Sequence, residues 1–327
     1  MSNVLAITNK GNVPLVTKYR PQRLKNVYGL KKHQKVLEGY IAKGGMPNML
    51  FIGPSGTGKT LIAEALCVEF GIDRQDVLTL NASEERGIET IRAKVINFGK
   101  TMKTLVSPFK VVILDEGDSL TKPAQQALRK VMEDYDHVRF IITGNDIGGI
   151  SKALQSRCSV MQFRGMHYKV LQELLQDIAR TEGTTLYDDV AKAIRVRCSG
   201  DARKAINLLE SVLMLDKPTE EDVAELSGIP SEANVWEVIY GALKGKMSAL
   251  KKYDEMVKGG EDPMQIAMIM YYGAVRGSIR GITPKQQLLV LRAIGSVPMA
   301  TAEQNTAAMI GRLINLVGLK DEEEEEE

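Results

Sequence analysis

A glycine-rich segment that ends in a lysine and a threonine is the first feature of this sequence that could carry out chemistry. It reads Gly53-Pro54-Ser55-Gly56-Thr57-Gly58-Lys59-Thr60 and fits the pattern GxxxxGK[ST] at every position. Glycines let backbone N–H groups turn toward phosphate oxygens, and a helix beginning near Lys59 adds the positive end of its dipole. Lys59 would place a charge on the β- and γ-phosphates, and the Thr60 hydroxyl would coordinate Mg²⁺. We therefore predict a nucleotide-phosphate site here.

Two adjacent carboxylates, Asp115 and Glu116, follow the apolar run Val111–Leu114 further along the chain. We expect this run to be a strand beside the strand that precedes the phosphate-binding segment, so that both carboxylates reach the phosphates. Asp115 would hold Mg²⁺ through a water, and Glu116 would orient and polarise the attacking water. The alternative is a pair of solvated carboxylates at a strand end. Neither motif reveals what the ATP is used for, because a phosphate-binding segment of this kind fits kinases, GTPases and helicases alike.

Short apolar runs alternate with amphipathic stretches in the first half of the chain. We predict strands at Asn48–Ile52, Val77–Leu80, Lys110–Leu114 and Arg139–Thr143. We predict helices at Leu61–Phe70, Ile88–Lys100 and Ala124–Tyr135. This alternation indicates an α/β domain in which a parallel sheet carries helices on both faces.

Helical patterns replace strand signals after Phe163. We predict helices at Val170–Glu182, Asp188–Cys198 and Ala202–Leu215. From about Gly228 an amphipathic, methionine-rich pattern runs to Lys320, and we interpret Met264, Met268 and Met270 as core filler. The chain then divides into a nucleotide-binding domain (1–163), a helical lid (164–227), a helical collar (228–320) and a disordered acidic tail (321–327).

The charge of the chain is distributed unevenly. The net charge is +2, but the last seven residues, Asp321 to Glu327, are all acidic. Without them, 43 basic residues face 34 acidic ones, which is a net charge of +9. A basic body is compatible with a phosphate-backbone partner. The tail is either a solubility device or an electrostatic competitor for DNA.

The sequence indicates a protein that stays inside the cell. No apolar run approaches the roughly 18–20 residues of a membrane span, and the first residues show no signal pattern, so we expect no membrane partner. Cys67, Cys158 and Cys198 lie far apart without a CxxC pair. This spacing disfavours zinc and a disulfide framework and fits a reducing compartment.

Six segments, one of which contains the Asp115-Glu116 pair, follow one another in a characteristic order. They are Lys18-Tyr19-Arg20-Pro21, Leu80–Ile88, Asp115-Glu116-Gly117-Asp118, Ala124–Arg129, Leu154-Gln155-Ser156-Arg157-Cys158 and Gly200–Asn207. Together they resemble the clamp-loader branch of the AAA+ ATPases, of the replication factor C small-subunit type, over roughly residues 14–215. The Ser-Arg-Cys segment is the most discriminating of them.

The resemblance implies further nucleotide contacts. Tyr19, Arg20, Pro21 and Val27 would pack on the adenine and reach the phosphates. Asn145, after the fourth strand, would bind the γ-phosphate and the attacking water as a first sensor; the alternative is a turn cap. Arg203, as a second sensor, would reach over the nucleotide from the lid; the alternative is a surface ion pair.

Arg157 has a different implied target. It lies too far along the sheet to serve its own phosphate site, and in the family it reaches the ATP held by the neighbouring subunit. Such an arginine stabilises the charge on the phosphoryl oxygens in trans. Lys130 is a second candidate for this kind of contact, and the alternative for Arg157 is a structural arginine beside Cys158. The resemblance also implies that Asn81 restrains Glu116 until DNA arrives.

The implied partners are the large subunit and other small subunits of a clamp loader, a sliding clamp of the proliferating-cell nuclear antigen type, and primer–template DNA. We expect Arg86, Arg92 and Lys94, at or near the start of helix Ile88–Lys100, to contact DNA phosphates, with Arg86 and Gln125 linking the DNA side to Asn81. The alternative is a solvated basic helix face. The segment Phe98–Pro108, with Met102, Leu105 and Val106, would face the clamp or else belong to the core.

Some residues depart from the family pattern. Leu15 stands where tryptophan is frequent, Gly117 replaces an alanine, and Thr143-Gly144 precede Asn145 where Ser-Cys is commoner. None removes a catalytic group, so we predict an ATPase that opens and loads a clamp, in the cytoplasm of an archaeon or a virus-infected prokaryote, or in a eukaryotic nucleus. The alternatives are a weakly hydrolysing or non-hydrolysing scaffold subunit of the same ring and another DNA-acting AAA+ motor, such as a branch-migration motor.

Overall fold

The chain forms two compact units, one ending at Asp216 and one beginning at Lys217. The structure is a computed structural model that describes residues 13–84, 88–228, 230, 232–277, 279, 281–295, 306 and 308–315. The acidic tail and Arg86 lie outside the described residues. The finer division into nucleotide-binding domain, lid and collar stays a prediction.

A five-stranded parallel sheet forms the centre of the first unit, and its strand order is β2-β3-β4-β1-β5. The strands are β1 (Met49–Ile52), β2 (Val77–Asn81), β3 (Lys110–Asp115), β4 (Val138–Gly144) and β5 (Ser159–Gln162). The predicted fold class and the four predicted strands are confirmed. The edge strand β5 was not predicted, because only Met161 of its four residues is buried and the segment lacks an apolar run.

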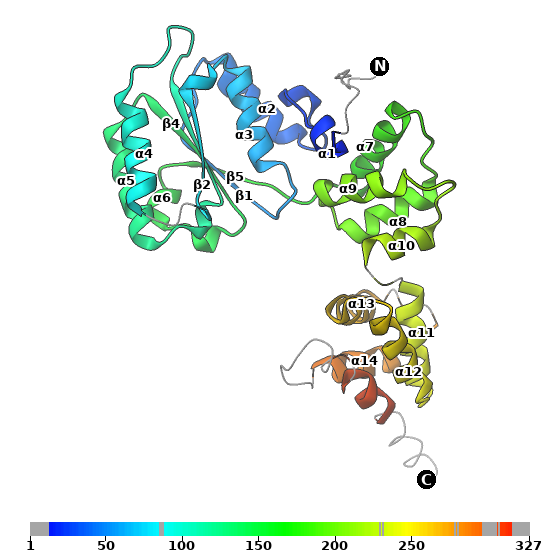
Figure 1. Ribbon diagram of the computed structural model, residues 1–327. Helices are drawn as coiled ribbons and strands as arrows, with labels where there is room; N and C mark the ends of the chain where they lie inside the picture. The colour runs from blue at the N-terminus through cyan, green and yellow to red at the C-terminus, as the bar shows by residue number, and fades with distance from the viewer. Residues whose placement is uncertain are drawn as a thin grey trace. The chain divides into compact units, whose positions relative to one another are not determined.

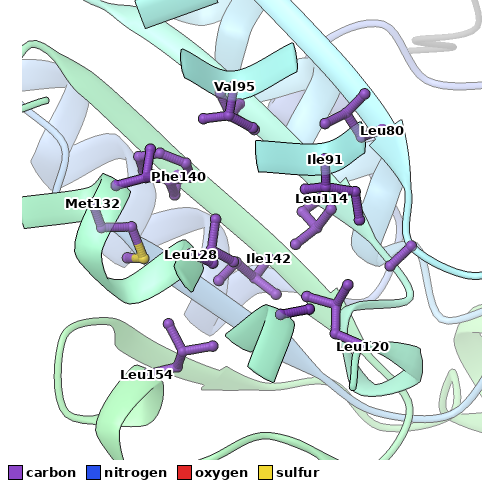
Figure 2. Close-up of a cluster of buried hydrophobic side chains, with 14 of the residues drawn as sticks. Leu80, Ile91, Val95, Leu114, Leu120, Leu128, Met132, Phe140, Ile142 and Leu154 are labelled. Carbon is purple, nitrogen blue, oxygen red and sulfur yellow. The ribbon is translucent and has the colours of Figure 1, made fainter. Parts of the chain in front are cut away.

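Helices cover both faces of the sheet (Figure 1). One face packs on α4 (Ile88–Lys100), α5 (Lys122–Asp134) and α6 (Lys152–Gln155), and Figure 2 shows Val95, Leu128 and Leu154 meeting Leu114 and Ile142 there. The other face packs on α2 (Lys31–Ala42) and α3 (Lys59–Glu69) through Leu37, Ile62 and Leu66. Alternate residues of β3 enter the two cores, as a two-sided parallel sheet requires.

Three more helices complete the first unit after β5. They are α7 (Tyr168–Thr181), α8 (Asp188–Cys198) and α9 (Ala202–Val212). The N-terminal elements α1 (Leu15–Lys18) and η1 (Leu24–Asn26) connect to them, because Lys18 Nζ pairs with Glu182 at 2.7 Å and Tyr28 Oη donates to Asp177 at 2.8 Å. The segment between β5 and α7 also bonds to the loop between α8 and α9, because Met166 N donates to Gly200 O at 2.8 Å.

The second unit is helical throughout its described residues. Its helices are α10 (Glu220–Ser227), α11 (Glu232–Leu243), α12 (Ser248–Lys258), α13 (Pro263–Arg276) and α14 (Pro284–Gly295), with further helical residues between 306 and 315. Val238, Ile239 and Ile266 belong to a core to which α11, α12, α13 and α14 contribute. The interpretation of the methionines as core filler holds for Met270 and is wrong for Met264 and Met268, which are 52% and 42% exposed.

None of the helices in the described parts of the chain is long and apolar enough to cross a membrane.

Candidate nucleotide-binding site

The phosphate-binding loop lies between β1 and α3, at the carboxyl ends of the parallel strands. Gly56 and Gly58 adopt left-handed φ values of 69° and 89°, which favour glycine. Gly58 directly precedes the first turn of α3, so the N–H groups of that turn face the loop. The local geometry is that of a backbone cradle for an anion.

Two close approaches hold this loop in place. A Cβ atom at Gly53 would lie 2.2 Å from the Phe163 carbonyl oxygen, and one at Gly56 would lie 1.8 Å from Asp201 Oδ1. Asp201 caps α9 by accepting from Lys204 N at 3.0 Å. The loop is therefore packed against both the end of β5 and the start of α9, which leaves space only for glycine at these positions.

Lys59 is buried at the centre of the site and joins the loop to β4. Its Nζ donates to Gly53 O at 2.7 Å, to Pro54 O at 2.9 Å and to Asn145 Oδ1 at 3.1 Å. Burial lowers the pKa of Lys59, and nearby carboxylates, with Asp115 foremost, oppose this effect. The structure thus brings Lys59 and Asn145 together.

The carboxylate of Asp115 connects β3 to the phosphate-binding helix. Its Oδ1 accepts from Thr60 Oγ1 at 2.8 Å and also from the hydroxyl of the buried Thr143. The expectation that β3 lies beside β1 is wrong, because β4 separates the two strands. Asp115 still reaches Thr60, since parallel strands end at one edge of the sheet. Thr60 and Asp115 supply the oxygen donors that Mg²⁺ prefers, so this pair fits the predicted metal site.

Glu116 leaves the sheet at the same edge in an unusual conformation. Its φ is 56°, in the left-handed region, and its backbone N donates to Thr143 Oγ1 at 3.2 Å. A non-glycine residue held in that region costs about 1–3 kcal/mol, and such residues gather at functional sites. Glu116 is half-buried, so its carboxylate is accessible to solvent.

The N-terminal segment that should contact adenine lies between α3 and α7. The Tyr19 hydroxyl donates to the Glu182 carboxylate, and burial together with that carboxylate raises the pKa of Tyr19. Arg20 Nη2 pairs with Glu64 at 2.6 Å, and Val27 packs on the α2–α3 core. Pro21 is half-buried. The segment therefore joins the two sets of helices that flank the phosphate-binding loop.

Arg203 approaches the same site from α9. It is exposed, and its positive charge acts on Lys59 by lowering the pKa of that ammonium, after burial and the opposing carboxylates. Arg203 therefore lies close enough for its charge to act on Lys59, and its contact with the nucleotide stays a prediction.

Arg157 lies at the other end of the strands. Ser159 pairs with Met49 at the start of β1, whereas the phosphate-binding loop follows Ile52 at its end. Since β5 and β1 are neighbours, Arg157 is remote from its own loop along the strand direction and not across the sheet. Its guanidinium donates to Ala153 O at 3.1 Å and pairs with the Glu133 carboxylate on α5.

The candidate DNA and clamp residues that the structure describes are on the surface of the first unit. Arg92 and Lys94 are exposed on α4. Met102, Leu105 and Val106 are 95%, 102% and 76% exposed, so the alternative that they belong to the core is wrong.

The two residues predicted to pass a DNA signal are engaged differently. Asn81 Oδ1 accepts from Ser83 N at 3.0 Å, and its amide nitrogen donates to Glu84, with no bond to Glu116 among the described contacts. Gln125 is buried and 2% exposed, so it cannot face DNA itself. It joins two segments by bonding Leu120 O after η3 (Gly117–Ser119) and both Gly149 O and Ser151 N before α6.

Sequence reasoning missed Thr143, Asp118 and Asp201 as parts of the site. The sequence shows Thr143 only as a departure from the family pattern. It shows Asp118 only as the last residue of the segment Asp115-Glu116-Gly117-Asp118. Asp201 precedes a helix, which is the usual place of a cap, and a cap does not by itself indicate contact with a distant glycine. Only the fold brings these three residues to the loop.

Comparison with known proteins identifies the class first. Residues 49–166 match the family model "ATPase family associated with various cellular activities (AAA)". The fold agrees, because the RuvB Holliday junction branch migration motor of Thermotoga maritima superposes with a TM-score of 0.52 at 20% identity, over 68% of this chain and 78% of that one. At this identity the likeness concerns the fold alone.

Relatives define the family. The replication factor C small subunit 2 of Pyrobaculum aerophilum is 39% identical over 76% of this chain and 80% of its own length. The replication factor C small subunit of Methanococcus maripaludis is 36% identical over 94% of this chain and 98% of its own length. The chain belongs to the replication factor C small-subunit family, the clamp-loader branch of the AAA+ ATPases, and is a nucleotide-binding ATPase. The family and the ATPase activity that the sequence predicted are confirmed.

Proposed function

We propose that the site binds ATP with Mg²⁺ and that hydrolysis drives the loading of a sliding clamp onto primer–template DNA. The observation that carries the proposal is the convergence of Lys59, Asn145, Thr60 and Asp115 at one edge of the sheet. Lys59 and the loop N–H groups would bind the β- and γ-phosphates. Thr60 and Asp115 would hold Mg²⁺, which neutralises phosphate charge when bound.

Glu116 and Asn145 would act on the attacking water. Glu116 is adjacent to Asp115, which would hold the metal, so Glu116 would accept the proton of the water as the oxygen attacks the γ-phosphate. Asn145 would orient the water and contact the γ-phosphate from β4, while Arg203 would contact it from α9. The bond between the β,γ-bridging oxygen and the γ-phosphorus breaks, and the products are ADP and phosphate.

Arg157 would complete the site of a neighbouring subunit. Its position at the opposite end of the strands from its own loop supports a target outside its own chain. A guanidinium that enters from a partner stabilises charge on the phosphoryl oxygens, and it ties hydrolysis to correct assembly. The pair with Glu133 would have to rearrange or extend when Arg157 meets a phosphate.

An exposed face of α13 supports assembly through the second unit. Met264, Met268, Tyr271, Tyr272 and Val275 recur at helical spacing and are 42–52% exposed. The opposite face of the same helix, with Ile266 and Met270, is in the core. A helix that is apolar on both faces is suited to a second packing partner, and we assign it to another subunit of the ring.

The remaining partners would use the first unit. The exposed apolar tip made by Met102, Leu105 and Val106 is suited to an apolar groove on a sliding clamp. Arg92 and Lys94 on α4, together with Arg86, would contact DNA phosphates without reading sequence.

Turnover in the reconstituted complex tests this function. We expect ATP hydrolysis to rise when both a sliding clamp and primer–template DNA are added, and clamp to co-purify with the complex in a non-hydrolysable ATP analogue. A scaffold subunit would bind ATP without contributing turnover, so Glu116→Gln in this chain alone would leave the rate of the complex unchanged. A motor of another kind would show no response to the clamp.

A further inference from the structure

Asp118 makes hydrogen bonds that have no part in the proposed steps of ATP hydrolysis. It lies in the short 3-10 helix η3 (Gly117–Ser119), directly after the Asp115–Glu116 pair. Its Oδ2 accepts from Asn145 N at 3.0 Å and from Asp146 N at 3.2 Å. Its Oδ1 is buried and, within the described part of the chain, has no hydrogen-bond partner. One carboxylate thus holds two consecutive N–H groups of the loop that presents Asn145.

Glycine backbones enclose this carboxylate. A Cβ atom at Gly149 would lie 2.8 Å from Asp118 Cβ, and one at Gly144 would lie 3.2 Å from Asp118 Oδ1. A Cβ atom at Gly117 would lie 2.5 Å from Ile142 Cγ2, so the turn that carries Asp118 is pressed against β4. Because the space is filled by backbone on several sides, Asp118 has little freedom to move relative to Asn145.

The fixed backbone determines where the Asn145 side chain points. With its N–H held by Asp118, Asn145 directs Oδ1 to Lys59 Nζ at 3.1 Å. Asp118 therefore supports the Lys59–Asn145 contact through the Asn145 backbone while lying outside the contact itself.

We infer that Asp118 is a positioning residue for ATP hydrolysis: it fixes the Asn145 backbone so that the Asn145 amide is preorganised for the γ-phosphate and the attacking water. The inference rests on the proposed role of Asn145. Donors and acceptors that are preorganised in this way act in the transition state, and displacement of such a group by about 1 Å can lower a rate by up to about a hundredfold.

A double-mutant cycle in the assembled complex tests this inference. The variants are Asp118→Ala, Asp118→Asn, Asn145→Ala and the double variant Asp118→Ala/Asn145→Ala, each assayed for kcat and for KM toward ATP. We expect Asp118→Ala to lower kcat by about tenfold or more, with KM changed less than about threefold, since the lost interaction belongs to the transition state. In the Asn145→Ala background the same change should have little further effect on kcat.

Two comparisons separate positioning from general support of the fold. Asp118→Asn keeps an oxygen that can accept both N–H groups, so it should recover part of the kcat lost in Asp118→Ala. The control is Asp136→Ala, which removes a fully exposed carboxylate of the same unit and should leave kcat unchanged. Thermal unfolding of each variant subunit identifies any that fail to fold; if Asp118→Ala does, the cycle is run with Asp118→Asn.

Additive effects of the Asp118 and Asn145 changes on kcat would overturn the inference while leaving the proposed function intact. A rise in KM with unchanged kcat in Asp118→Ala would overturn it as well. Normal turnover in Asn145→Ala would remove the proposed role of Asn145 and the inference with it.

Discussion

The ammonium group of Lys59 provides the positive charge at the centre of the candidate phosphate site. It is buried, and three oxygen atoms accept from it, two from the loop carbonyls and one from Asn145. Burial disfavours the charged form, which the surrounding carboxylates favour. The charge that would bind phosphate is thus held in place by the same acidic groups that would hold the metal and activate water.

Substitutions of Lys59 and Glu116 should separate ATP binding from turnover. We expect Lys59→Ala to abolish ATP binding, because the phosphates lose their fixed charge. Glu116→Gln should keep binding, since Asp115 and Thr60 remain, and should lower turnover by about 10²–10⁴-fold. Equilibrium binding of a fluorescent ATP analogue and steady-state phosphate release measure the two effects. The exposed Lys43 provides the control Lys43→Ala. Normal turnover in Glu116→Gln would contradict the assignment of the base.

At the scale of elements, the loop that carries the apolar tip after α4 is held by two buried charged side chains, Asp76 and Lys110. Asp76 accepts from Thr104 N at 2.9 Å and from the Thr104 hydroxyl, while Lys110 Nζ donates to Phe98 O at 2.7 Å and Thr101 O at 3.1 Å. Asp76 and Lys110 are each 1% exposed. The exposed Met102, Leu105 and Val106 therefore project from a loop whose base is fixed on both sides.

Removal of the Asp76 carboxylate should loosen that loop. Asp76→Ala leaves the Thr104 N–H without its acceptor, which costs about 1–3 kcal/mol for a buried group. Burial raises the pKa of Asp76, but the bonds from Thr104 and Ser107 and the charge of Lys110 outweigh it, so the pKa is lowered. The stabilisation is therefore present above the ordinary aspartate pKa of 3.8 and is lost as the pH falls through the lower folded value.

Denaturant unfolding at neutral and acid pH measures this effect. Wild type and Asp76→Asn should differ at neutral pH and converge at the lowest pH. The control is Asp136→Asn, whose side chain is fully exposed. An equal difference between wild type and Asp76→Asn at both pH values would contradict the assignment.

The elements show how far sequence reasoning reaches. Apolar runs predict buried strands, and helical periodicity predicts amphipathic helices. The bounds of helices Ile88–Lys100 and Asp188–Cys198 were predicted as the structure has them. Strand order is not a local property, so the expectation that β3 lies beside β1 was wrong. Single side chains such as Thr143 and Asp118 reach the site only through tertiary contacts, and no motif encodes those.

At the scale of the whole molecule, the apolar face of α13 should govern assembly. We expect Met268→Glu/Tyr272→Glu to leave the isolated subunit as stable as wild type, because both side chains are 42–44% exposed. Assembly should weaken by at least about tenfold, equivalent to ~1.4 kcal/mol. Light scattering after size-exclusion chromatography measures the assembly. The control Leu226→Glu alters a comparably exposed apolar residue of α10. Unchanged assembly of the double variant would exclude this face as the interface.

Arg157 yields a prediction that crosses subunits. Arg157→Ala should leave ATP binding by the isolated subunit nearly unchanged and should lower turnover of the assembled ring by about a thousandfold or more, as loss of an arginine finger does. Mixing an Arg157→Ala subunit with a Lys59→Ala subunit should restore some turnover, because one contributes the intact loop and the other the intact arginine. The control is Arg180→Ala, at an arginine whose side chain is 76% exposed. Co-assembled mixtures without recovered activity would count against the action in trans.

The placement of the loop and Arg157 at opposite ends of the same parallel strands gives each subunit a head and a tail. A contact of head to tail is heterologous, so one geometry can be repeated from subunit to subunit, and its rotation decides whether the series closes. In a series that stays open, the subunit at one end would have a loop that no arginine reaches. The subunit at the other end would have an arginine that reaches no loop. With Arg157 acting in trans as proposed, such an arc would contain one fewer complete catalytic site than it has subunits. The gap through which DNA could pass and the single incomplete site would then coincide.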